Sequence, residues 1–101
     1  MKKLTELENQ RIALLNARID QLKTKGWDNL SDLEKLELLK LQQEVLNIEL
    51  DQIKRKNPPL SEEDLKRLQE IEDEMQRLKM QELLLKEKMG TLNEEEKKFL
   101  E

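Results

Sequence analysis

Cysteine and histidine are both missing from the 101 residues of this chain. Without thiols the chain can form no disulfide. Zinc, haem and iron–sulfur sites lose their usual ligands, and neither a cysteine nor a Ser/His/Asp nucleophile system can be assembled. The sequence therefore predicts no cofactor and no metal centre of these kinds.

Long apolar runs and a dominant charge are also lacking. No segment approaches the roughly 18–20 apolar residues that a membrane span needs, and the N-terminus leads into an amphipathic pattern rather than a signal peptide. The net charge is −4, divided into +1 over residues 1–56 and −5 over residues 57–101, with no long block of one sign. Charge alone therefore selects neither a nucleic acid nor a membrane. We expect a soluble, cytoplasmic protein without a targeting signal.

Clusters of like charge are present, and each has a plain structural explanation. The acidic runs 62–64 and 70–74 lack the spacing and the glycine of a calcium loop, and suit a solvated helix face with ion pairs one turn apart. The basic run 54–56 could contact RNA, but cations are also favoured at a helix C-terminus, and no tyrosine accompanies them. Because no phosphate-binding loop or pocket signature is visible, we expect no enzyme, no nucleic-acid partner and no small-molecule substrate.

A repeated signature marks the expected helix starts. In Leu30-Ser31 with Glu34, a leucine precedes a small polar residue and a carboxylate follows three residues later. The polar side chain can accept from an exposed helix N–H, and the carboxylate favours the positive end of the helix. The same pattern occurs at Thr5, Ser61 and Asn93, and turn residues lie between the segments at Gly26, Pro58-Pro59 and Gly90. The chain is thus predicted to be one helical domain over residues 1–101, with helices at about 5–25, 31–56, 61–89 and 93–101.

The stretch 36–53 is apolar on two opposite faces, so other segments must cover it from both sides. One seam with alternating steps of three and four residues consists of Leu36, Leu39, Gln43, Leu46, Leu50 and Ile53, and a second of Leu38, Leu41, Val45, Ile48 and Gln52. The seams lie about 180–200° apart around a helix. Short loops make sequential helices antiparallel, so helix 5–25 fits the second seam and helix 61–89 the first. The predicted fold is an all-α antiparallel three-helix up-down-up meander with a bifacial central helix, coiled-coil-like packing and a short C-terminal helix.

Several large apolar residues are left off these seams. They are Leu7 and Leu14 in the first helix, and Met80, Leu83 and Leu84 in the third. Soluble monomers seldom expose large apolar patches, so these residues predict an interface of a homo-oligomer. In the alternative, the fourth helix covers them and the protein is a compact monomer.

Three further residues have two interpretations each. Trp27 lies in a loop, where it could anchor a partner protein or cap the bundle end together with Met89, Leu92 and Phe99. Gln43 and Glu82 interrupt the seams, and polar residues at such positions can fix helix register. A carboxylate in an apolar site could also be a perturbed acid, but the better interpretation places Glu82 at a seam edge beside Lys86.

The runs 57–71 and 90–101, in which Leu-Ser-Glu-Glu and Leu-Asn-Glu-Glu follow short loops, resemble computationally designed helical bundles and helical oligomers. Repeated capping signatures, leucine-rich cores and Glu-to-Lys spacing are what design rules prescribe. The resemblance implies a structural, self-assembling scaffold whose partner is a second copy of itself. The alternative is a natural coiled-coil adaptor, scaffolding protein or inhibitor of phage or bacterial type that binds another protein.

Overall fold

The structure is a computed structural model that describes residues 2–101. The prediction of an all-helical chain is confirmed, since four α-helices and one short 3-10 helix account for the regular structure and no strand occurs among the described residues. The elements are α1 (Lys2–Lys25), η1 (Trp27–Asn29), α2 (Asp32–Lys54), α3 (Glu62–Met89) and α4 (Glu94–Leu100).

Three of the four predicted helix starts carry the expected caps. The Ser31 and Asn93 side chains each accept a hydrogen bond from the third helical residue, whose glutamate in turn accepts from the cap N–H. Ser61 caps α3 through the N–H of Asp64. The start at Thr5 was wrong: α1 already begins at Lys2, because the preceding residues include no proline or glycine to stop the helix.

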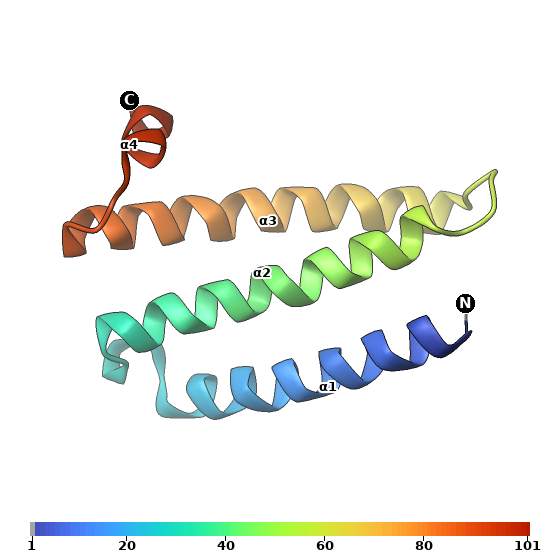
Figure 1. Ribbon diagram of the computed structural model, residues 1–101, viewed down its shortest axis with the longest axis horizontal. Helices are drawn as coiled ribbons and strands as arrows, with labels where there is room; N and C mark the ends of the chain where they lie inside the picture. The colour runs from blue at the N-terminus through green and yellow to red at the C-terminus, as the bar shows by residue number, and fades with distance from the viewer. Residues whose placement is uncertain (1) are drawn as a thin grey trace.

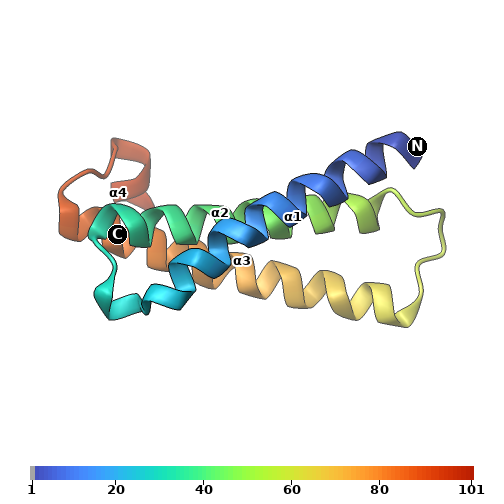
Figure 2. The same ribbon diagram turned by 90° about the horizontal axis from the view of Figure 1, so that it is seen from below.

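Helix α2 lies between α1 and α3, and sequential helices run in opposite directions (Figures 1 and 2). The molecule measures 44 × 32 × 21 Å along its principal axes. Helices α1 and α3 each pack against α2, and α1 crosses it obliquely (Figure 2). Among the described residues, the sides of α1 and α3 that face away from α2 have no long helix against them.

The contact between α1 and α2 combines an apolar core with ion pairs at its edge. Buried leucine, isoleucine and valine side chains form one cluster, and the second seam of α2 supplies its half of that cluster. The cluster comprises Leu15, Ile19, Leu22, Leu30, Leu38 and Val45, with Ile12, Leu41 and Ile48 packed against it. Arg11 pairs with Glu44 and Arg18 with Glu37, each at 2.9 Å. These pairs fit the predicted antiparallel register.

The contact between α2 and α3 has its own buried residues. Leu39 of α2 is 2% exposed, and Ile71 and Leu78 of α3 are 0% and 5% exposed. Arg67 of α3 pairs with Glu49 of α2 at 2.8 Å on the exposed side. Helix α2 is therefore buried on two faces, as its two seams predict.

The short helix α4 turns back beside the C-terminal end of α3, on the side away from α1 (Figure 1). Gly90 ends α3 in the left-handed conformation, with φ 74°, which glycine adopts without strain. An ion pair of 2.9 Å between Lys86 and Glu96 joins α3 to α4. No residue of α4 itself is buried.

Candidate functional site

Three leucines of α1, which we call the α1 surface, project into solvent. Leu7 is 63% exposed and Leu14 is 68% exposed, as the sequence predicted, and Leu4 is 44% exposed. All three repeat at helical spacing, and Arg11 and Arg18 lie one turn to either side of Leu14. Arg11, which is ion-paired with α2, therefore interrupts the apolar stripe between Leu7 and Leu14.

The neighbouring part of α2 extends this apolar area. Leu33 is 70% exposed. It opens a shallow groove of about 300 Å³ lined by Leu33, Leu36, Glu37, Lys40, Leu41 and Glu44. Because Glu37 and Glu44 are the ion-pair partners of Arg18 and Arg11, the groove adjoins the α1 surface.

A second apolar area lies across α3 and α4, and we call Met80, Leu84 and Phe99 the α3–α4 surface. These side chains are 41%, 51% and 64% exposed. A groove of about 560 Å³ lies beside them, lined by Gln43, Met75, Gln76, Lys79, Met80 and Phe99. The sequence predicted Met80 and Leu84 as interface residues. It placed Phe99 elsewhere, in a cap over the end of the bundle.

Leu83 does not belong to this surface, and its predicted place there was wrong. The side chain is only 1% exposed. It lies one turn before Lys86, whose ion pair with Glu96 holds α4 against this part of α3. Leu83 is thus buried in the part of α3 beside which α4 returns, whereas Leu84 is 51% exposed.

Trp27 lies in the turn between α1 and α2 and is 43% exposed. The Lys35 ammonium lies 5.4 Å from its ring centre, within the range of a cation–π contact. Phe99, the expected capping partner, instead lines the groove next to Met80. Trp27 is thus half exposed, and its role as a partner anchor stays a prediction.

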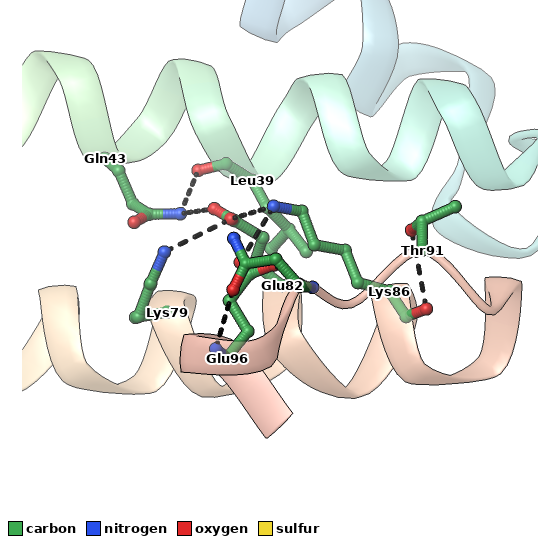
Figure 3. A network of polar contacts seen from close by, with 8 residues as sticks. Leu39, Gln43, Lys79, Glu82, Lys86, Thr91 and Glu96 are labelled. Carbon is green, nitrogen blue, oxygen red and sulfur yellow. Dashed lines mark hydrogen bonds and ion pairs between the residues drawn. The ribbon is translucent and has the colours of Figure 1, made fainter. Parts of the chain in front are cut away.

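The most buried polar group is the Glu82 carboxylate on α3, which is 4% exposed. Gln43 of α2 donates to it at 2.7 Å and also to the Leu39 carbonyl at 3.2 Å. Lys79 and Lys86 each pair with Glu82 at 3.3 Å, and Lys86 continues to Glu96 of α4 (Figure 3). The network therefore connects α2, α3 and α4.

The sequence identified both Gln43 and Glu82 but did not join them. Its register paired Gln43 with Met75, and the seam-edge position of Glu82 was wrong because the side chain is buried. The signal was available, since each residue is a polar interruption in one of two facing seams. Buried polar groups need partners, so two such interruptions in facing seams are good candidates for a pair.

The network fixes the charge state of its members. Burial raises the pKa of Glu82, but the hydrogen bond from Gln43 and the charges of Lys79 and Lys86 outweigh it, so the pKa lies below its ordinary value of 4.5. The Glu96 ion pair raises the pKa of Lys86, and the same contact lowers the pKa of Glu96. Glu82 is therefore ionised at neutral pH and is not poised as a general acid.

Metal-ligand clusters and membrane-spanning helices are both absent from the described residues. Among residues 2–101 there is no cluster of three acidic, histidine or cysteine side chains arranged to hold a metal ion. None of the helices described combines the length and the hydropathy required to cross a bilayer. Every buried side-chain nitrogen or oxygen in this part has a hydrogen-bond partner. The buried hydrogen-bonding groups of the network are therefore all satisfied by residues of the same chain.

Comparison with protein families, with curated proteins and with solved structures finds no match to this chain. The apolar surfaces and the buried network are therefore the features on which a function must be argued.

Several carboxylates make the free energy of unfolding depend on pH. The ion pair with Lys25 and the Ser31 backbone N–H lower the pKa of Glu34 from 4.5 to about 2. The pKa values of Glu8, Glu37, Asp64, Glu82 and Glu96 are lowered as well. A lowered folded-state pKa stabilises the fold above the unfolded pKa, so the free energy of unfolding should stay level down to about pH 5 and fall between pH 4.5 and 2.

Urea unfolding followed by far-UV circular dichroism at several pH values measures this dependence. The variant Lys25→Gln serves as the control, because Glu34 then loses its ion pair and the slope below pH 4.5 should become shallower. Stability that rises on acidification would contradict the assignment of these ion pairs.

Proposed function

We propose that this chain is a structural helical scaffold that assembles with copies of itself and has no catalytic activity. Its fold is an up-down-up antiparallel meander of three long helices with coiled-coil-like packing, closed by a short fourth helix. The resemblance to designed helical oligomers supports the same proposal. The partner is a second copy of the chain.

The observation that carries the proposal is the exposure of Leu7 and Leu14 on one stripe of α1. These side chains are 63% and 68% exposed, while every buried side-chain nitrogen and oxygen of the described residues has a hydrogen-bond partner. Single exposed leucines are common, but exposed leucines that repeat along one helix face beside a groove are typical of an interaction surface. Burying one such leucine removes enough apolar area to contribute about 1.5–3 kcal/mol to association.

The alternative is an adaptor that uses the same stripe to bind a different protein. A scaffold reaches a defined oligomer alone, whereas an adaptor stays monomeric until its target is added. The exposed half of Trp27 is the feature that favours the adaptor, because tryptophan is enriched among residues that dominate binding energy.

Size-exclusion chromatography with light scattering at tens of micromolar distinguishes the two. We expect a mass that is a multiple of the 12.1 kDa monomer. Leu14→Glu should lower that mass with helicity retained, because the charge lies at the centre of the α1 surface. The matched control Ala13→Glu adds the same charge at the adjacent exposed position and should leave the mass unchanged. A wild-type mass of one monomer would refute self-assembly.

A further inference from the structure

We propose that α4 is a detachable arm, held on α3 by one ion-pair latch and able to open while the three long helices stay folded. A latch here is an ion pair between a lysine at the end of one helix and the carboxylate of the third residue of the next helix. In the α4 latch these residues are Lys86 and Glu96, 2.9 Å apart (Figure 3). The latch lies within one copy of the chain, so it does not depend on the proposed self-assembly.

The other two turns between helices are closed by latches of the same kind. Lys25 pairs with Glu34 at 2.6 Å across the first turn, and Lys56 pairs with Asp64 at 2.8 Å across the second. Glu34 and Asp64 are the third residues of α2 and α3, as Glu96 is of α4. The three turns therefore repeat one device, and they can be compared by the same substitution.

The Glu96 carboxylate both completes the cap of α4 and ties the helix to α3. One oxygen accepts from the Asn93 backbone N–H at 3.2 Å, and the other accepts from the Lys86 ammonium at 2.9 Å. Helix α4 has seven residues, whereas isolated helices below about 12–15 residues are marginal in water. Its helical structure therefore depends on docking, so α4 should unfold when it is released.

The three latches differ in what supports them. The first joins helices that share a buried apolar cluster, and the second joins helices that bury Leu39 and Ile71. No residue of α4 is buried, and its largest apolar side chain, Phe99, is 64% exposed. Among residues 2–101, the pair between Lys86 and Glu96 is the one ion pair that joins α4 to another helix. The contact of α4 with α3 therefore depends on its latch far more than the other two contacts do.

The α4 latch is also the most shielded of the three from water. The Lys86 and Glu96 side chains are 18% and 14% exposed, compared with 54% and 27% for Lys25 and Glu34. Lys86 is held in place by a second pair, at 3.3 Å, with the buried Glu82 carboxylate. Ion pairs that are partly removed from water are less screened and stabilise more than fully exposed ones.

Release of α4 would change the groove beside it. Phe99 lines this groove of about 560 Å³ together with Met75 and Met80. When α4 leaves, Phe99 is withdrawn from the groove, and Lys86 keeps only its pair with Glu82. Any change that neutralises Lys86 or Glu96 should therefore open the groove on this side.

Hydrogen exchange followed by mass spectrometry tests the arm, because it measures local opening of one segment against another. Glu96→Gln, Glu34→Gln and Asp64→Asn each neutralise one latch and keep a side-chain oxygen as acceptor. In Glu96→Gln the amides of residues 93–101 should exchange about tenfold faster, as expected for the loss of a hydrogen bond between charged groups. In the other two variants α2 and α3 should keep their protection beyond the first turn, because their apolar contacts remain.

A second variant separates the latch from the cap. Lys86→Met leaves the capping box of Glu96 intact, and Glu82 keeps its partners Gln43 and Lys79. It should release α4 as Glu96→Gln does. The matched control Glu95→Gln removes the same charge from an exposed position in the same turn and should leave exchange unchanged.

Four results would overturn the proposal. In the first, the wild-type amides of α4 exchange as fast as those of an unstructured peptide, so that the latch holds nothing. In the second, α4 stays protected in either Glu96→Gln or Lys86→Met. In the third, Glu95→Gln releases α4 as fully as they do. In the fourth, Phe99→Ala releases α4 more than Glu96→Gln, which would assign the contact to the apolar side chain.

Discussion

Leu39→Ala should lower the free energy of unfolding by about 2–5 kcal/mol, the range measured when a buried leucine is cut to alanine. Leu39 is 2% exposed and lies on the seam of α2 that faces α3. Its removal deletes apolar contacts and leaves a cavity between two long helices that cannot easily collapse. For a domain of this size, such a loss is a large share of a total stability of about 5–15 kcal/mol.

The matched control is Leu33→Ala, in which the same side chain is removed from the same helix at a position that is 70% exposed. Its effect should stay within about 0.5 kcal/mol, as for other surface substitutions. Both variants are compared by urea unfolding at one protein concentration, because association would add to the apparent stability. Equal losses for the two variants would contradict the assignment of Leu39 to the core.

Gln43→Leu should lower the free energy of unfolding by about 1.5–3 kcal/mol, which is the usual contribution of a buried hydrogen bond to a charged group. The Gln43 amide donates to Glu82 at 2.7 Å, and the Glu82 carboxylate is 4% exposed. Once Gln43 is gone, water cannot easily replace it, so a buried charge loses a donor while its desolvation cost stays. The control Gln10→Leu changes an exposed glutamine and should have little effect.

The double variant Gln43→Leu with Glu82→Leu should recover most or all of this loss. Replacing both members of a buried polar pair by apolar side chains is often neutral or stabilising, whereas removing one member is costly. Lys86 keeps its partner Glu96 in the double variant. A double-mutant cycle on the free energies of unfolding measures the coupling, and additive losses would show that the two residues act independently.

Helix boundaries were largely accessible from the sequence because their causes are local. Ser31, Ser61 and Asn93 cap helices through hydrogen bonds to residues three positions on, and Gly26 and Gly90 adopt positive φ where helices end. The exception, Thr5, has the same local signature, but a cap is used only where nothing upstream continues the helix. Capping preference therefore predicts a start without requiring one.

The candidate surfaces were predicted only in part. Leu7, Leu14, Met80 and Leu84 are exposed as expected, since each lies off its helix's buried stripe. The burial of Leu83 and the position of Phe99 in the groove were not predicted. The position of Phe99 depends on where α4 folds back. Helix α4 has only seven residues, so it has no repeating apolar seam from which its place could be predicted by register.

The sequence by itself determined that this chain is helical, where most of its helices begin and end, and that α2 must be covered on two faces. These properties follow from periodicity and from hydrogen bonds between residues near in sequence. Only the tertiary structure decided that Gln43 meets Glu82, and that Leu83 is buried whereas Leu84 is exposed. Each of these depends on contacts between distant segments, whose geometry is set by the packing of whole helices and not by local pattern.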